Sequence, residues 1–197
     1  MNTETKWSID QAHSEITFKV RHLMIAHVNG AFKTFDASIY TNEKNFFTAE
    51  VDLWIDAASI STGDAKRDEH LKSADFFDVA NHKQITFKSS TIEKSKKNGA
   101  HDLWGELTMR GVTKNVKLEV EFGGIVTDSW GREKAGFTVT GKINRSDWEL
   151  EWNSGMETGG VMVGDEVSIT CEVELINIGY KDLTMKLENE KATKMIM

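Results

Sequence analysis

Strict alternation of apolar and polar side chains recurs along this chain and limits its fold more than any other feature. Between residues 49 and 55 the apolar side chains are separated by Glu50, Asp52 and Trp54. A period of two places alternate side chains on opposite faces of a β-strand, so each such segment is predicted to be a strand with one buried face. About eight segments show the pattern: residues 16–22, 32–40, 49–55, 84–92, 103–109, 116–122, 135–143 and 167–175.

Long amphipathic strands of similar length leave two open edges if the sheet stays flat, and open edges pair with other chains. A sheet of about eight strands removes both edges by closing on itself, and a barrel of that size can hold one ligand. The 197 residues are few enough for one domain. We therefore predict an all-β fold, an eight-stranded antiparallel up-and-down barrel over residues 1–178. Residues 179–197 are expected to form a tail that is a short helix or disordered.

Turn-forming residues separate several of the predicted strands. The Asn-Gly pairs at residues 29–30 and 98–99 reach positive φ at little cost and predict hairpin turns. Residues 128–131, Asp-Ser-Trp-Gly, predict the tip of a further hairpin. Phe32 and Phe35 break the alternation by one residue, which predicts a β-bulge that bends the strand there.

One segment departs from the strand pattern. Residues 62–77 contain a run of helix-forming residues after Asp64, whose side chain can cap the N-terminus of a helix. We expect one or two short helices here, covering one end of the barrel.

Composition argues against several classes of protein. A formal net charge of −7 is unfavourable for binding nucleic acid. The single Cys171 cannot form an intramolecular disulfide, and the six His lack the close spacing of a structural zinc site. No apolar run is long enough to span a bilayer, so an integral membrane protein is not expected. The first residues lack a basic segment followed by an apolar run, which predicts a cytoplasmic protein, or a periplasmic one if a leader was removed.

Several blocks of sequence point to a known family by their order and spacing. They are residues 7–10, 13–22, 28–35, 58–62, 67–78, 105–114, 136–137, 143–148 and 163–167. Over residues 5–178 the chain resembles the YceI-like family of lipocalin-like polyisoprenoid-binding proteins. The resemblance implies an eight-stranded antiparallel barrel whose elongated cavity holds an amphiphile with an isoprenoid or similar acyl chain. The ligand class rests on this resemblance alone.

The inward-facing positions of the predicted strands are the candidate ligand-binding residues. They are Phe18, Val20, Phe32, Phe35, Leu53, Ile55, Phe87, Leu107, Met109, Phe137, Val139 and Ile169. These side chains could also fill the barrel completely and leave no cavity. The family resemblance favours the cavity.

Polar residues at the expected ends of the barrel are further candidates. His22 ends the inward register of its strand, and is either a hydrogen-bonded rim histidine or a partner for the head group of a lipid. Arg67 lies with Asp68 and His70 on the predicted helix. This group is expected to form a salt-bridged cap over one end of the barrel, with contact to the ligand's polar end as the alternative.

Aromatic residues outside the inward set have two predicted roles. Trp148, near a predicted ion pair of Arg145 with Asp147, is expected to act as an aromatic lid or to line the mouth of the barrel. Trp54 and Trp104 fall on the polar register and predict an exterior patch for a partner or a homodimer.

The sequence favours a binding protein over an enzyme. It contains neither a Gly-x-Ser-x-Gly nucleophile motif nor a glycine-rich phosphate loop, so no catalytic residue, metal or cofactor is predicted. We expect it to bind and to sequester or carry an amphiphilic lipid, namely an isoprenoid quinone or its precursor, or a polyprenyl or fatty-acid derivative. One alternative is a hydrolase or isomerase that acts on a bound lipid through His22 or through Arg67, Asp68 and His70. Another is an interaction domain with a filled barrel.

Overall fold

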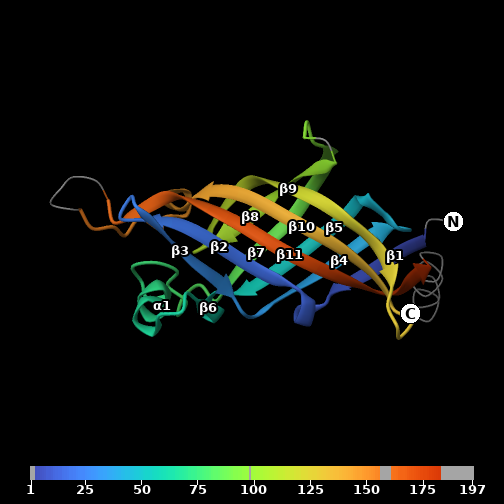
Figure 1. Ribbon diagram of the computed structural model, residues 1–197, viewed down its shortest axis with the longest axis horizontal. Helices are drawn as coiled ribbons and strands as arrows, with labels where there is room; N and C mark the ends of the chain where they lie inside the picture. Colours follow the sequence, from blue (N-terminus) through green and yellow to red (C-terminus); the bar gives the residue numbers. More distant parts are fainter. Residues whose placement is uncertain (1–2, 98, 156–160, 183–197) are drawn as a thin grey trace, which may run out of the picture.

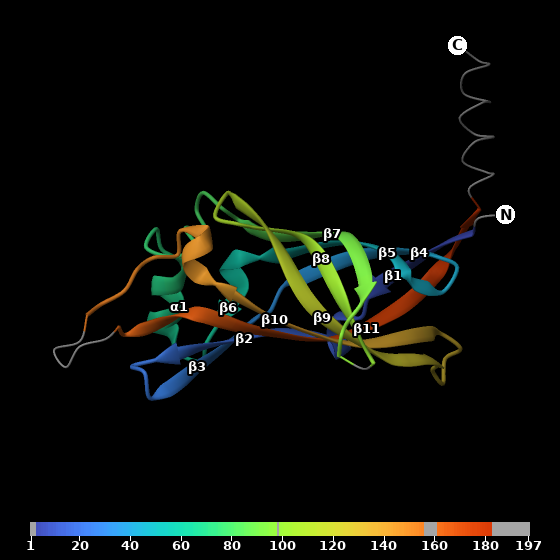
Figure 2. The same ribbon diagram turned by 90° about the horizontal axis from the view of Figure 1, so that it is seen from above.

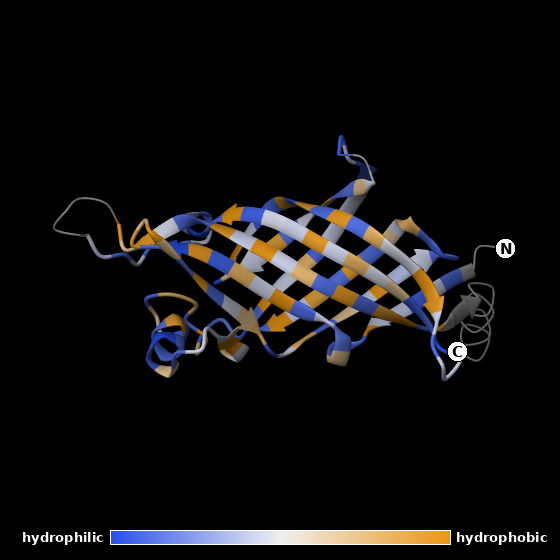
Figure 3. Cartoon of the chain, in the orientation of Figure 1, coloured by the Kyte–Doolittle hydropathy of each residue, from blue (hydrophilic) through white to orange (hydrophobic). Residues whose placement is uncertain are grey.

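The strands form one antiparallel sheet that closes on itself, as Figure 1 shows. The computed structural model describes residues 3–97, 99–155 and 161–182. Hydrophobic and hydrophilic residues alternate along the strands that wrap the barrel (Figure 3). The strands are β1 (Thr3–Ile9), β2 (Glu15–His22), β3 (Ala26–Phe32), β4 (Phe35–Asn42), β5 (Asn45–Asp56), β6 (Ile60–Ser61), β7 (Gln84–Lys94), β8 (Ala100–Met109), β9 (Val112–Thr127), β10 (Glu133–Asn144) and β11 (Val163–Asp182).

The ring contains eight strands because two pairs of labelled strands are each one interrupted strand. β1 and β2 are separated by the short helix η1 (Gln11–His13), and both pair with β11. β3 and β4 follow one another in the same way, and pair with β2 and β1 respectively. The pairing of β1 with β11 closes the ring. The prediction of an eight-stranded antiparallel barrel is therefore confirmed.

Among the described residues one α-helix is present, and it lies at one end of the barrel, beside β6 (Figures 1 and 2). This helix, α1 (Ala65–Lys72), begins where the sequence predicts, because the Asp64 carboxylate accepts a hydrogen bond of 2.9 Å from the Arg67 N–H. The turns η2 (Ala57–Ser59) and η3 (Arg145–Trp148) complete the helical elements of the described residues. None of these helices has the length and hydropathy needed to cross a membrane.

The Asn-Gly pair at residues 29–30 does not form the predicted turn. It lies inside β3, and the β2–β3 turn is formed instead by Leu23 and Met24, with φ of 51° and 63°. The reason lies in the opposite strand: a Cβ atom on Gly30 would come within 2.3 Å of Phe18 Cζ. Glycine is needed at this position for the close approach of a ring and not for a turn.

The predicted bulge between Phe32 and Phe35 is also wrong. The chain leaves β3 at Phe32 and starts β4 at Phe35, with residues 33–34 between the two strands. The break keeps both rings buried on the inner face. The predicted turns at Gly99 and at residues 128–131 are present, with Gly99 at φ 82°, whereas residue 98 lies outside the described residues.

The two ends of the described chain differ from the sequence-based boundaries. β1 was not predicted, because only Trp7 and Ile9 mark its inner face and the third inward residue is the buried Thr5. β11 continues to Asp182, four residues past the predicted end of the barrel at 178. The tail from residue 183 lies outside the described residues.

Two sets of polar contacts fix β1, whose pairing with β11 closes the ring. Inside, the fully buried Trp7 donates its Nε1–H to Thr41 Oγ1 at 3.0 Å. Outside, Lys134 Nζ lies 2.9 Å from Asp10 Oδ2 and 2.5 Å from Glu174 Oε1. Lys134 is only 7% exposed. A buried charge needs compensation, and the two carboxylates from neighbouring segments supply it.

The pH dependence of stability should report the Asp10–Lys134 contact. The hydrogen bond from Lys134 lowers the pKa of Asp10 from its ordinary value of 3.8 to about 2. A depressed folded-state pKa stabilises the fold above the unfolded pKa, and this contribution is lost as the pH falls from 3.8 to about 2. Asp10→Asn, which retains a capping side chain for η1, should lower the free energy of unfolding at pH 7 by about 1 kcal/mol, allowing for solvent screening.

Urea denaturation at pH 7 and at pH 2 measures this difference. At pH 2 Asp10 of the folded protein is about half protonated, so the difference in stability between the two proteins should fall to less than half of its value at pH 7. Asp52→Asn, which removes an exposed partner of Lys88 at 3.5 Å, is the matched control and should change stability little at either pH. An equal loss for Asp10→Asn at both pH values would contradict the electrostatic explanation.

Candidate functional site

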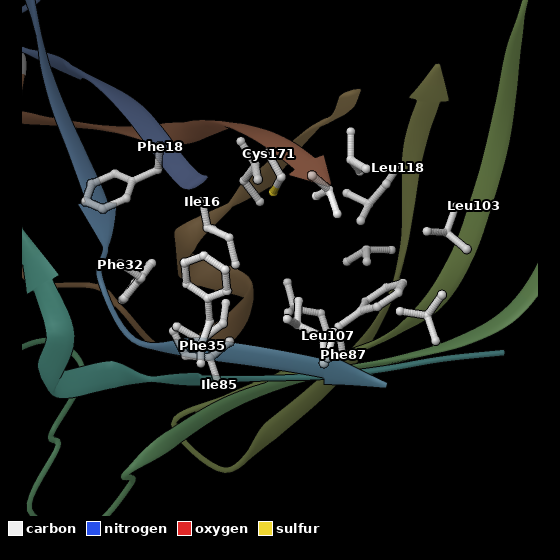
Figure 4. Close-up of a pocket in the computed structure, with 18 of the residues that line it drawn as sticks. Ile16, Phe18, Phe32, Phe35, Ile85, Phe87, Leu103, Leu107, Leu118 and Cys171 are labelled. Atoms are coloured by element: carbon white, nitrogen blue, oxygen red, sulfur yellow. The ribbon is translucent and has the colours of Figure 1, made fainter. Parts of the chain in front are cut away.

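A cavity of about 430 Å³ occupies the interior of the barrel. Its volume falls in the range of roughly 300–1,000 Å³ that is usual for small-molecule sites. Side chains from several strands point into it, among them Phe18, Phe87, Leu103 and Leu118 (Figure 4). The lining is almost entirely apolar, so the site is suited to a hydrocarbon chain and the barrel is not a filled core.

Most of the candidate binding residues line this cavity. Twelve of the fifteen do so: Phe18, Val20, Phe32, Phe35, Leu53, Ile55, Phe87, Leu107, Met109, Phe137, Val139 and Ile169. They come from β2, β3, β4, β5, β7, β8, β10 and β11, so nearly every part of the barrel wall contributes.

The remaining three candidates, His22, Arg67 and Trp148, are not among the lining residues. His22 lies at the end of β2, paired with Ala26 across the hairpin. Trp148 is only 1% exposed and donates its Nε1–H to the Leu107 carbonyl at 3.0 Å, so it is part of the packed core. Trp148 therefore anchors η3 to β8, which differs from the predicted role at the mouth.

Arg67, Asp68 and His70 make local contacts at the α1 end of the barrel. Arg67 donates its Nε–H to Thr62 Oγ1 at 2.7 Å, and Asp68 accepts from the Thr62 N–H at 2.8 Å. His70 Nε2 lies 3.1 Å from Asp75 Oδ2. The group thus fixes the start of α1 through hydrogen bonds to Thr62, and not through the predicted salt bridge of Arg67.

Arg145 is a lining residue that the sequence analysis assigned to a different contact. The predicted ion pair with Asp147 is not formed; the guanidinium instead donates to backbone carbonyls, including those of Gly164 and Trp152 at 3.0 Å. Arg145 is buried, and this burial lowers the pKa of its guanidinium. Its donors tie η3 to the segment that follows, at the α1 end of the cavity.

Three glycines let large lining side chains lie against the wall of the barrel. A Cβ atom on Gly30 would clash with the end of the Phe18 ring, as described above. A Cβ on Gly105 would lie 2.4 Å from Phe87 Cζ, and one on Gly141 would lie 2.4 Å from Leu118 Cδ2. In each case the large side chain covers the bare backbone of a neighbouring strand. The middle of the barrel stays open because these side chains do not have to cross it.

Cys171 lies in the wall of the cavity, where Figure 4 shows its sulfur atom. Burial raises the pKa of this thiol to about 12. At neutral pH the group is therefore protonated and a poor nucleophile.

One cluster outside the cavity has the residue types of a metal site. Asp10, His13 and Glu174 bring potential ligand atoms within 4.8 Å of one another. However, the ammonium group of Lys134 binds the carboxylates of Asp10 and Glu174 at the same place. The cluster is therefore an ion-pair network in which a lysine already supplies the positive charge.

Trp54 on β5 and Trp104 on β8 are partly exposed outside the barrel, at 37% and 39%. This position agrees with the polar register on which the sequence places them. The homodimer that they suggested stays a prediction.

Comparison with known proteins agrees with this architecture. The YceI-like domain family matches residues 7–175. A UPF0312 protein of Staphylococcus aureus is 36% identical over 171 residues, which cover 86% of this chain and 96% of that protein. The crystal structure of a Campylobacter jejuni YCEI protein has a TM-score of 0.66 and 33% identity, covering 88% of this chain and 96% of the other.

Two more distant structures share the fold. BcnA of Burkholderia cenocepacia has a TM-score of 0.72 at 24% identity, covering 84% of this chain and 98% of its own. A polyisoprenoid-binding domain from Saccharophagus degradans, implicated in plant cell wall breakdown, has a TM-score of 0.61 at 17% identity, with coverage of 87% and 98%. At these identities the likeness concerns the fold alone. From the family match and the close relatives, the chain belongs to the YceI-like family.

Proposed function

We propose that this protein binds an amphiphilic lipid with a long apolar chain, and sequesters or carries it inside the barrel. The observation that carries this proposal is the apolar cavity of about 430 Å³ in the interior. Each methylene group transferred from water into such a site contributes about 0.8 kcal/mol. Ordering a flexible chain opposes binding, but a chain of many carbons retains a large net gain.

An isoprenoid chain is the proposed ligand class, with fatty-acid derivatives as close alternatives. Support comes from the similarity in fold to the Saccharophagus degradans domain, which is described as polyisoprenoid-binding. The lining itself is aliphatic and aromatic, and it offers few polar groups that could measure the length of a chain. We therefore expect loose selectivity for chain length.

An enzyme that acts on the bound lipid is the weaker alternative. The residues suggested for such chemistry, His22, Arg67, Asp68 and His70, are absent from the lining of the cavity. Arg67 and Asp68 are bonded to Thr62, which gives them a local structural role. A lipid that leaves the protein unmodified in native mass spectrometry fits a carrier, whereas turnover that is lost in His70→Ala would favour the enzyme.

Two matched pairs of variants test lipid binding in the cavity. Val139 lines the cavity on β10, whereas Val126 is 65% exposed on β9 and is not a lining residue. Val139→Asp places a charge among apolar groups and Val139→Trp fills the space, so each should reduce the retained lipid about tenfold or more. Val126→Asp and Val126→Trp should retain as much lipid as the unaltered protein.

Native mass spectrometry of the purified proteins, followed by organic extraction, measures the retained lipid. Circular dichroism of each variant checks that the barrel has folded. Equal retention by folded Val139 and Val126 variants, or no lipid bound by any of the proteins, would refute a binding function of the cavity.

Gly30→Ala should make the cavity smaller. The added methyl group would force the Phe18 ring away from β3 and into the lumen, and such overpacking costs about 1–3 kcal/mol. Gly136→Ala is the control, because a Cβ atom there meets nothing within 4 Å. Crystal structures of both variants measure the effect. A Phe18 ring that turns outward, with the cavity unchanged, would show that Gly30 does not keep the barrel open.

A further inference from the structure

The wall of the barrel opens between β5 and β7. Their backbones pair only where residues 52–56 face residues 84–88. Beyond this point, residues 45–51 pair with β4 alone and residues 89–94 with β8 alone among the described residues. The hairpin of β7 and β8 turns away from the hairpin of β4 and β5 in both Figure 1 and Figure 2.

Ser89 marks the point at which the two strands part. Its hydroxyl accepts a hydrogen bond of 2.8 Å from the Val51 N–H, in place of a backbone carbonyl. We call the separation beyond Ser89, bounded by residues 45–51 and 89–94, the seam. A seam in a barrel wall exposes what lies behind it, and here that is the cavity.

The cavity reaches the surface along this seam. Phe47, Ala49, Ile92 and His101 all line it, and yet Phe47 is 55% exposed. The rings of Phe47 and His101 meet edge to face across the opening, with centroids 4.4 Å apart at 81°. These two side chains therefore form a small closure over the opening.

The β5 side of the seam is held in place from behind. Lys44, in the β4–β5 turn, forms an ion pair with Glu133 of β10. The Phe46 ring packs against Phe137 with centroids 4.8 Å apart. Widening of the seam is therefore expected from the side chains at its edge, not from movement of the whole hairpin.

His101 is a polar residue on an inward register that is otherwise apolar. It occupies the same face of β8 as Leu103, Leu107 and Met109, which are buried in the lining. Its imidazole has no hydrogen-bond or ion-pair partner among the described residues. One ring nitrogen of a neutral imidazole donates and the other accepts, so the side chain can bind a hydroxyl or carbonyl oxygen.

At the α1 end of the cavity, the described lining residues are apolar apart from Arg145. Phe76 and Leu150 are buried there, and the Phe77 ring packs on Phe32 with centroids 5.9 Å apart. Arg145, the charged residue of that end, donates to backbone carbonyls. A ligand with one polar and one apolar end therefore has a preferred orientation in this barrel.

We infer that the lipid enters tail first through the seam between β5 and β7, past Phe47, and that its oxygen-bearing head group hydrogen-bonds to His101. This inference rests on the proposed lipid-binding function and adds the entrance and the head-group site. It assigns Phe47 to access and His101 to recognition of a hydroxyl or carbonyl group.

Access can be measured without any lipid, because Cys171 is the sole cysteine and lies in the cavity wall. Delipidated protein is treated with monobromobimane, a neutral thiol reagent, at pH 9. Its rate should increase with pH, since the thiol has a pKa of about 12. Phe47→Ala should raise the rate about fivefold or more, whereas Phe77→Ala, the same change at the α1 end, should leave it within about twofold.

A faster reaction of Phe77→Ala, with the rate of Phe47→Ala unchanged, would place the entrance beside α1 and overturn the inference. An unchanged rate in both variants would also overturn it, because Phe47 would then not control access. Neither result depends on which lipid the protein binds, so lipid binding in the cavity could still hold.

Recognition of the head group is tested with hexadecanol and hexadecane as competitors of a fluorescent fatty ligand. His101→Leu should weaken hexadecanol binding about tenfold, the loss expected for one hydrogen bond, and leave hexadecane unaffected. His101→Gln, which keeps a donor and an acceptor, should restore most of the affinity. Equal affinities of the unaltered protein and His101→Leu for hexadecanol would refute the head-group site alone. Failure of the unaltered protein to bind either compound would instead refute the proposed function.

Discussion

Close contact between large side chains and bare backbone is the constraint on which the hollow barrel depends. An inner face rich in Phe, Leu and Ile can fill a barrel of this size, and close packing is the usual result in protein interiors. Here Phe18, Phe87 and Leu118 each lie over a glycine of a neighbouring strand. The same apolar side chains that drive folding therefore coat the wall, and the space between them is left for a ligand.

An unfilled interior has an energetic cost, because lining atoms lose dispersion contacts on one side. The structure offsets part of this cost with the contacts that hold β1 in the ring. Trp7 is fully buried and hydrogen-bonded to Thr41, and Lys134 joins carboxylates from two segments on the outer side. A bound apolar chain would restore the missing contacts and stabilise the folded state further.

Much of the fold could be predicted from sequence because the alternation directly reflects a sheet with one buried face. It identified the barrel and twelve of the lining residues. It missed β1, whose inward Thr5 is polar yet fully buried in the contacts around the ring closure. The Asn-Gly pair at residues 29–30 misled in another way: the local preference for a turn was overridden by the packing of Phe18 across the hairpin.

The polar residues of the site were harder to predict, because their roles depend on where the wall opens. The sequence suggests Asp147 as the partner of Arg145. In the structure, however, the Arg145 guanidinium donates to the backbone carbonyl of Gly164, 19 residues further along the chain. His101 precedes the alternating segment 103–109 and stands out only once β5 and β7 are seen to separate in front of it. No periodicity encodes that separation, since each strand keeps its own alternation while it loses a neighbour.

The α1 end and the seam therefore differ, for different physical reasons, in the polar groups that they offer to a ligand. At the α1 end, buried rings surround the Arg145 guanidinium, which already donates to backbone carbonyls, so a ligand could use it only by breaking an existing contact. At the seam, the loss of strand pairing exposes an aromatic ring and an imidazole with no competing partner among the described residues. Because displacing an existing hydrogen bond gains little net free energy, a polar head group is better bound at the seam. The direction in which a lipid lies in this barrel is then set by where the protein's own hydrogen bonds are already satisfied.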